Sequence, residues 1–176
     1  MQRGKDILMK IAKKQQLPHA SLCQMTEQGP KDIDLAKLTG GKKVILIGMP
    51  GAFTKTCTNH HLPSLVRHSR ALFDKGIDEI ICVVVNDIHV TKAWGDLTGA
   101  TKAGIKILSD LESKFATSIG LSFSVPAVGF FDRLQRVLIV LNDNSIEHIQ
   151  LEEKRSECDL TSGEAILTLV DKIFDF

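Results

Sequence analysis

The sequence predicts an α/β sandwich in which helices flank a mixed central sheet. Three apolar runs, at residues 44–47, 80–85 and 105–108, each precede a segment with helical periodicity. This alternation is typical of buried parallel strands that are connected by helices. Residues 137–141 and 146–151 are strand-like on either side of the turn sequence Asn-Asp-Asn-Ser, which predicts an antiparallel hairpin. The sheet is therefore expected to have a parallel half and an antiparallel half.

Length and composition favour one soluble globular domain. The chain has 176 residues, of which 43% are hydrophobic and 24% charged, enough for one well-buried core. A net charge of +1 without a basic cluster argues against nucleic-acid binding. No apolar run approaches the ~20 residues needed to cross a membrane. Four cysteines without a Cys-x-x-Cys pair favour intracellular thiols over a disulfide framework or a zinc site.

Residues 1–16 are predicted to form a basic N-terminal extension of a domain that spans residues 17–176. The first fourteen residues contain five basic side chains against a single acid, with apolar residues at helical spacing, which predicts a basic amphipathic helix. This helix is either part of a segment that directs the protein to mitochondria or another organelle, or a surface helix of a cytoplasmic protein.

A long helix is predicted after the first apolar run. Residues 20–25 are expected to form a strand and residues 32–38 a short helix before that run. After Cys57, apolar residues at helical spacing predict a helix that packs on the core and ends at Gly76. Pro63 lies inside it, so we expect a kink between the turn that carries Cys57 and the rest of the helix. That turn is expected to unwind easily when the cysteine must move.

Three further helices follow the later strands. Asn86 and Asp87 are predicted to cap the first, residues 112–119 form the second, and Thr161 with Glu164 gives the last one a capping box. The predicted inward face of the first helix consists of Val90, Ala93, Trp94 and Leu97.

The chemistry is concentrated in the sequence MPGAFTKTC, residues 49–57, where a strand leads into a helix. Free N–H groups and the positive end of the helix dipole then face the sulfur of Cys57, which favours the thiolate over the thiol. Thr54 is close enough in a tight turn to direct its hydroxyl at the sulfur or at the group that the sulfur attacks. Pro50 fixes φ and has no N–H, so it stiffens the loop and screens one side of it.

This loop resembles a known active site. The wording PGAFTKTC, followed by His-Leu-Pro, is similar to the active-site loop of the peroxiredoxins, specifically their type II, peroxiredoxin-5-like branch. Residues 78–87 and 91–95 also resemble that branch, and the resemblance runs from about residue 20 to the end of the chain. It implies a thioredoxin-like sandwich, a peroxidase activity that depends on Cys57, and a homodimer.

An arginine is expected beside the cysteine. Attack of a thiolate on a peroxide displaces hydroxide or alkoxide, so a fixed cation with hydrogen-bond donors must stabilise the leaving oxygen. Arg133 and Arg136 are the two candidates. Peroxiredoxins place their active-site arginine at the start of an apolar strand, and on this resemblance we select Arg136 and expect Arg133 to be a surface residue.

The adjacent histidines are not predicted to bind a metal. Cys57 and His61 are i and i+4, but two further ligands are missing and His60 points to a different side of the helix. His61 matches a histidine that is common in the family motif, and the resemblance implies a supporting role beside the loop.

Two other cysteines are candidates for the resolving role. Cys82 reads as a buried packing residue, but some plant type II peroxiredoxins carry a second redox cysteine twenty-five positions after the first, and the resemblance makes Cys82 a candidate. We expect its sulfur to lie too far from Cys57 for a bond in the reduced fold. Cys158 lies among acidic residues, and Ser162 occupies the position at which other members have their resolving cysteine.

The predicted function is a thiol peroxidase that reduces hydrogen peroxide and small organic hydroperoxides. Cys57 would become a sulfenic acid and be recycled by an external thiol, from glutathione with glutaredoxin or from thioredoxin. No cofactor is predicted. The alternatives are a thioredoxin-like thiol–disulfide oxidoreductase, which the missing Cys-x-x-Cys pair disfavours, and a non-enzymatic redox sensor.

Overall fold

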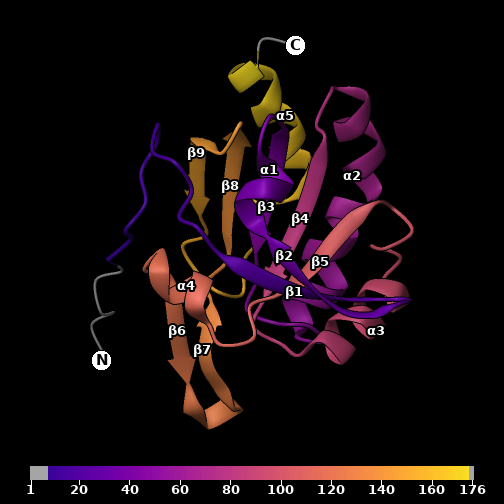
Figure 1. Ribbon diagram of the computed structural model, residues 1–176, viewed down its shortest axis with the longest axis vertical. Helices are drawn as coiled ribbons and strands as arrows, with labels where there is room; N and C mark the ends of the chain where they lie inside the picture. The colour runs from indigo at the N-terminus through magenta and orange to yellow at the C-terminus, as the bar shows by residue number, and fades with distance from the viewer. Residues whose placement is uncertain (1–7, 175–176) are drawn as a thin grey trace.

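The computed structural model describes residues 8–174, which form a seven-stranded sheet between two layers of helices (Figure 1). The elements in chain order are β1 (Ser21–Thr26), β2 (Gly29–Asp34), α1 (Leu35–Thr39), β3 (Lys43–Gly48), the π-helical turn η1 (Cys57–His61), α2 (Leu62–Asp74), β4 (Glu79–Val84), α3 (Ile88–Leu97), β5 (Ile105–Ser109), α4 (Lys114–Ser118), β6 (Ser122–Val125), the 3₁₀ turn η2 (Pro126–Val128), β7 (Phe130–Leu134), β8 (Val137–Asn142), β9 (Ser145–Leu151) and α5 (Gly163–Phe174).

The central sheet is mixed, as predicted. Its strand order is β2-β1-β5-β4-β3-β8-β9, with β5, β4 and β3 parallel to one another. The predicted hairpin of β8 and β9 extends the sheet antiparallel to β3, and β1 with β2 does so beside β5. The predicted α/β sandwich is confirmed.

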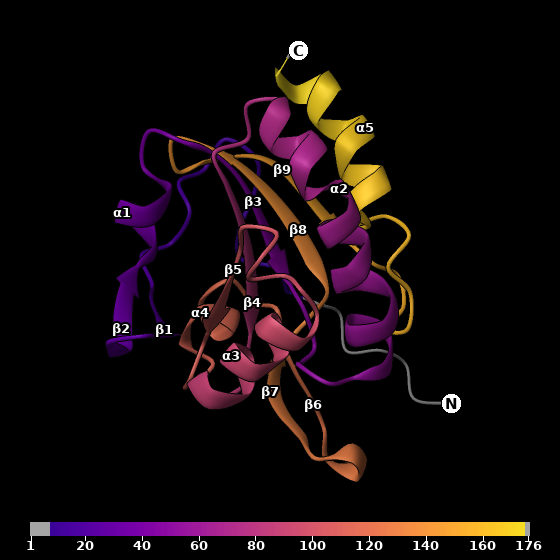
Figure 2. The same cartoon turned by 90° about the vertical axis from the view of Figure 1, so that its right-hand side faces the viewer.

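Two apolar cores cover the two faces of this sheet. Side chains of β3 and β4 alternate between them, because successive residues of a strand point to opposite faces. Ile45, Ile47 and Cys82 belong to the core under α2, α3 and α5, whereas Leu46 and Val83 belong to the core under α1 and α4. Figure 2 shows α2 and α5 together on one side of the sheet and α1 and α4 on the other.

Three strands, β2, β6 and β7, were not predicted. β2 continues to Asp34 and occupies the start of the predicted helix 32–38; Asp34 then caps α1 by accepting a hydrogen bond from the Lys37 N–H (3.2 Å). The small β6–β7 hairpin was missed altogether. These strands lie at an edge or outside the main sheet with mostly half-buried or exposed side chains, so they lack the apolar runs of the central strands.

The predicted inward face of α3 is only partly correct. Asp87 caps the helix as expected, since its carboxylate accepts bonds from the N–H groups of His89 (2.9 Å) and Val90 (3.0 Å). The residues buried in α3 are Thr91, Trp94 and Gly95, whereas Ala93 is exposed and Leu97 is 74% exposed. The helix is thus rotated toward the side on which Gly95 allows close contact with Ile107.

The predicted capping box of α5 is wrong. Ser162 is the capping residue: its hydroxyl accepts from the Ala165 N–H (3.2 Å) and its carbonyl from the Ile166 N–H (2.9 Å). Thr161 is buried and bonded elsewhere. Close contact between α5 and α2 explains Gly163, because a Cβ there would lie 2.4 Å from the Ser64 carbonyl oxygen.

The described part of the N-terminal segment is not helical. Residues 8–14 contain no helix, and the rest of the predicted amphipathic helix lies outside the described residues. The Lys10 N–H donates to the Ile119 carbonyl (2.9 Å), Ile11 is 4% exposed, and Gln16 pairs with Ser145. The boundary between an extension of residues 1–16 and a domain of residues 17–176 stays a prediction. Over residues 8–174, no helix combines the length and apolarity required to cross a bilayer.

Candidate active site

Cys57 lies in a turn that is wider than an α-helical one. The chain becomes helical at Lys55, and the Leu62 N–H then bonds to the Cys57 carbonyl, five residues earlier. Pro63 follows in the first turn of α2, where a missing N–H costs little. The predicted break between the cysteine and the rest of the helix is therefore present, as a π-helical turn. Such turns are less favourable than α-helix and are frequent at functional sites.

Arg136 is the cation that contacts Cys57. Its Nη2 donates to the Cys57 sulfur at 3.4 Å, and both residues are buried, at 2% and 0% exposure. Gly48, the last residue of β3, pairs with Val137 at the start of β8, so Arg136 lies beside the loop that leaves β3. Its buried Nε–H has no hydrogen-bond partner among residues 8–174. An unpaired buried donor beside a thiol is suited to bind a polar substrate atom.

His61 holds the other nitrogen of the arginine. Arg136 Nη1 donates to His61 Nδ1 (2.6 Å), and His61 Nε2–H donates to the Thr161 carbonyl (2.8 Å). Burial, reinforced by the charge of Arg136, lowers the pKa of His61 to about 3. The ring is thus neutral at physiological pH, and both nitrogens are engaged within the protein. His61 therefore orients Arg136 and offers no free nitrogen to a metal or a proton.

Arg133 is not the free surface residue that the sequence led us to expect. Its Nη1 donates to Asn86 Oδ1 (3.0 Å) and to the Pro50 carbonyl (3.5 Å), and Asn86 Oδ1 also accepts from the Ala52 N–H (3.0 Å). A Cβ at position 51 would lie 2.6 Å from this Nη1, so Gly51 makes room for the guanidinium. The arginine and the asparagine together hold the loop between Pro50 and Thr54. The one sequence feature that pointed to this contact between Arg133 and Asn86 was the position of Asn86 directly after a predicted parallel strand.

Thr54 belongs to the same loop but does not bond to the sulfur. Its hydroxyl donates to the Gly51 carbonyl (2.8 Å), and no Thr54–Cys57 hydrogen bond is found in the described part of the chain. Phe53, the preceding residue, is 53% exposed and has a positive φ of 59°. A left-handed conformation is unusual for an aromatic residue and marks the sharp turn that brings Thr54 toward the helix.

The remaining cysteines are all free thiols with different surroundings. Cys82 is fully buried in the same core as Cys57; burial and the nearby Cys57 raise its pKa, against a smaller opposing effect of Arg136. Cys158 is half-buried, and burial is also the main cause that raises the pKa of its thiol. Cys23 is buried in β1, where it pairs with Ser109 of β5.

Known proteins share this sequence and fold. The Redoxin family model matches residues 12–167. "Peroxiredoxin-2E-2, chloroplastic" of Oryza sativa subsp. japonica is 34% identical over 84% of this chain and 67% of its own length. "Peroxiredoxin-2F, mitochondrial" of Arabidopsis thaliana is 35% identical over 76% of this chain and 66% of its own length. The chain thus spans about two thirds of the length of these plant relatives.

A solved structure agrees over almost its whole length. Reduced Prx3 of Vibrio vulnificus, in complex with hydrogen peroxide, has a TM-score of 0.85 and 34% identity, and the match covers 91% of this chain and 99% of that one. A thioredoxin-like sandwich in which a buried cysteine near the start of a helix contacts a buried arginine just before β8 is the architecture of a thiol peroxidase. The chain belongs to the Redoxin family, and within it to the peroxiredoxins.

Proposed function

We propose that Cys57 is the peroxidatic cysteine and that Arg136 stabilises both its thiolate and the leaving oxygen. The sulfur lone pair attacks the terminal oxygen of a hydroperoxide, the O–O bond breaks, and hydroxide or alkoxide leaves and takes up a proton. Cys57 is left as a sulfenic acid. The observation that carries this proposal is the 3.4 Å contact between Arg136 Nη2 and the Cys57 sulfur, next to the unpaired Nε–H of the same arginine.

Thr54 and Pro50 are proposed to complete the peroxide site. The Thr54 hydroxyl hydrogen is directed at the Gly51 carbonyl, so its oxygen has lone pairs available to accept the peroxide proton. Pro50 is buried and presents no N–H, so it shields one side of the sulfur from water. Hydrogen peroxide and small organic hydroperoxides are the substrates that we assign to this site.

Recycling by an external thiol is the proposed second half of the reaction. A donor thiol attacks the sulfenic acid, water leaves, and a mixed disulfide forms; a second donor thiol then releases Cys57 as a thiol. Complete burial of Cys82 and the raised pKa of its thiol disfavour it as the internal alternative. Glutathione with glutaredoxin, or thioredoxin, is the donor that we assign.

Peroxide turnover by the purified protein tests this function. With a thiol donor in excess, the wild type is expected to consume hydrogen peroxide catalytically, and Cys57→Ser to abolish consumption, because a serine hydroxyl is not appreciably ionised near neutral pH. Cys23→Ser is the matched control, since it removes a buried thiol of β1 that lies outside the apolar cluster containing Cys57. Near-wild-type turnover by Cys57→Ser would refute the proposal.

A homodimer is the assembly that we propose. The β6–β7 hairpin projects from the body of the molecule (Figures 1 and 2), and Val128 and Phe131 on it are 63% and 62% exposed. Exposed apolar side chains on a projecting element favour contact with another chain. Light scattering coupled to size-exclusion chromatography should give twice the mass of one chain, and Phe131→Ser should shift the protein toward the monomer.

The compartment is proposed to be the cytoplasm, or a mitochondrion or another organelle if the basic N-terminus belongs to a targeting segment. The named relatives include a chloroplastic and a mitochondrial protein. Because Lys10 and Ile11 contact the folded domain, such a segment could not be removed beyond them without loss of native contacts. Imaging of the chain with a C-terminal fluorescent fusion, with and without residues 1–7, distinguishes the two locations.

A further inference from the structure

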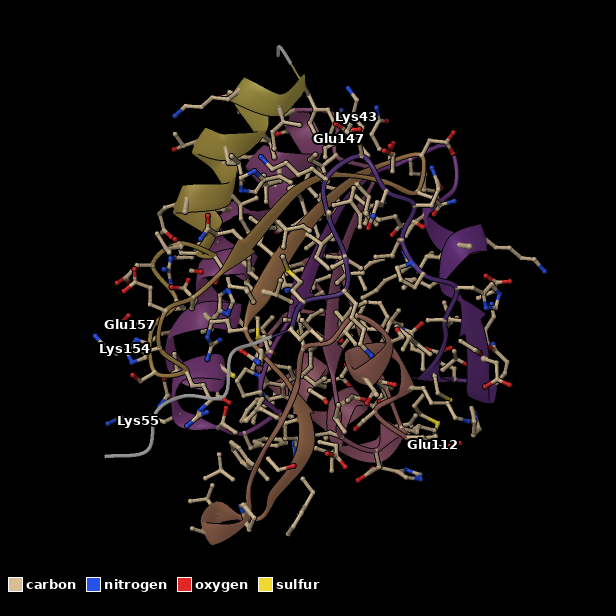
Figure 3. All side chains as sticks on the ribbon, turned by 90° about the vertical axis from the view of Figure 1, so that its left-hand side faces the viewer. Lys43, Lys55, Glu112, Glu147, Lys154 and Glu157 are labelled. Carbon is tan, nitrogen blue, oxygen red and sulfur yellow. The ribbon has the colours of Figure 1, made fainter. Side chains whose placement is uncertain are left out.

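The loop between β9 and α5, residues 152–161, is bonded directly to the turn that carries Cys57. Arg136 Nη2 donates to the Arg155 carbonyl (3.2 Å), the Thr56 hydroxyl to the Ser156 carbonyl (3.2 Å), and His61 Nε2–H to the Thr161 carbonyl (2.8 Å). Figure 3 shows Lys154 and Glu157 of this loop on the same edge of the molecule as Lys55. Backbone carbonyls of the 152–161 loop therefore hold Arg136, Thr56 and His61 in place beside Cys57.

Glu152 closes this loop on itself. Its Oε1 accepts from the Thr161 N–H (2.7 Å) and from the Thr161 hydroxyl (2.8 Å). Its own N–H donates to the Arg136 carbonyl (3.4 Å). Glu152 thus joins the main chain of Arg136 to the far end of the loop, where the Thr161 carbonyl accepts the hydrogen bond from His61.

These contacts form a closed ring around the arginine. It runs from the Arg136 main chain to Glu152, then to Thr161, to His61, and back to the Arg136 side chain. Thr161 and His61 are both at 0% exposure, so a bond lost from the ring leaves buried polar groups unpaired. A ring of this kind allows the guanidinium one position, in contact with Cys57.

We propose that Glu152 is a positioning residue of the peroxidase: its carboxylate keeps the 152–161 loop closed, and the closed loop holds His61 and Arg136 against Cys57. This inference rests on the proposed function. Glu152 bonds to neither the sulfur nor the unpaired Arg136 Nε–H, so its effect is transmitted through Thr161 and His61.

The sign of the effect separates positioning from simple charge. Loss of a carboxylate near Arg136 would, through space alone, make the site more positive and favour the Cys57 thiolate. Loss of the ring releases Arg136 from the sulfur and disfavours the thiolate. We therefore expect Glu152→Ala to slow peroxide consumption about tenfold and to move the midpoint of the pH–rate profile upward.

Two variants serve as controls. Glu153→Ala removes the same charge from the adjacent residue, which is exposed, and should stay within about twofold of the wild type. Glu152→Gln removes the charge but keeps an Oε1 acceptor, and should restore most of the rate and the wild-type midpoint. Thr161→Val keeps the N–H bond to Glu152 and deletes the hydroxyl, which bonds to Glu152 (2.8 Å) and lies 3.2 Å from His61 Nε2, so it should shift both quantities in the same direction by less.

Rates and pH profiles are measured on folded protein, as judged by circular dichroism, with the wild type and Cys57→Ser run in parallel. If Glu152→Ala is unfolded, Thr161→Val carries the test. Variants at Glu152 and Thr161 that match Glu153→Ala in rate and midpoint would overturn the positioning role while leaving the peroxidase intact. A wild type without peroxide turnover would instead refute the proposed function, and this inference with it.

Discussion

Cys57 and Cys82 share one apolar core but differ in their immediate surroundings. Cys57 and Cys82 are both at 0% exposure and belong to the same apolar cluster. Cys57 is in a π-helical turn and accepts a hydrogen bond from a buried guanidinium, whereas Cys82 is in the middle of a parallel strand pair, opposite Ile47. Burial raises the pKa of Cys82. Burial is therefore common to both thiols, and the buried cation and the π-helical turn are what distinguish the surroundings of Cys57.

Removal of the Arg136 guanidinium should have the largest effect on the difference between Cys57 and Cys82. Arg136→Ala should leave Cys57 in surroundings like those of Cys82, and we expect the rate constant for peroxide to fall about a hundredfold or more. Stopped-flow measurement of the reduced protein with hydrogen peroxide gives this value directly. Cys57→Ser sets the baseline. A rate within about threefold of the wild type would mean that another group stabilises the leaving oxygen.

The neutral histidine that holds this cation should make stability depend on pH. The pKa of His61 is about 3 in the folded protein against an ordinary 6.5, so between these values the unfolded chain binds more protons. The contribution of His61 to stability is therefore complete above about pH 6.5 and is lost as the pH falls toward 3. For this residue we expect a loss of about 2 kcal/mol between about pH 7 and about pH 5.

Chemical denaturation of paired variants at those two pH values isolates this effect. His61→Asn keeps an acceptor for Arg136 in place of Nδ1 but cannot take up a proton, so its stability should fall less with acid than that of the wild type. His60→Asn, at the exposed neighbouring position, should behave like the wild type. Equal acid sensitivity of all three proteins would contradict the assignment of a neutral, buried imidazole.

The second arginine of the site tests how much the loop matters compared with the cation. Arg133 touches the loop through Asn86 and Pro50 but makes no hydrogen bond to Cys57 among the residues described. Arg133→Ala should lower the rate constant by about five- to tenfold, through a looser loop. Lys55→Ala removes an exposed cation from the residue that follows this loop and serves as the control. A larger loss in Arg133→Ala than in Arg136→Ala would reverse the roles of the two arginines.

What the sequence could predict follows from the range of the interactions involved. The sequence predicted four central strands, because a strand buried on both faces has a continuous run of apolar residues. These strands are β3, β4, β5 and β8. The loop around Cys57 was predicted because its residues are adjacent in the chain. β2, β6 and β7 have mixed surroundings and no such pattern. Contacts such as Arg133 with Asn86, or Glu152 with Thr161, exist only after distant segments are folded together, and no local pattern encodes them.

The smallest expected effect concerns Cys82 itself. Cys82→Ala removes a thiol that is buried and whose pKa is raised, so turnover with an external thiol should stay within about twofold of the wild type. A Cys57–Cys82 disulfide would require the π-helical turn to open and Cys57 to reach into a strand that is covered on both faces. Mass spectrometry of wild-type protein treated with peroxide, without added thiol, should therefore find Cys57 as a sulfenic or more highly oxidised acid with Cys82 unmodified. A stoichiometric Cys57–Cys82 disulfide would show that the turn opens far enough to bring the two thiols together, and the external thiol would then reduce that disulfide instead of the sulfenic acid.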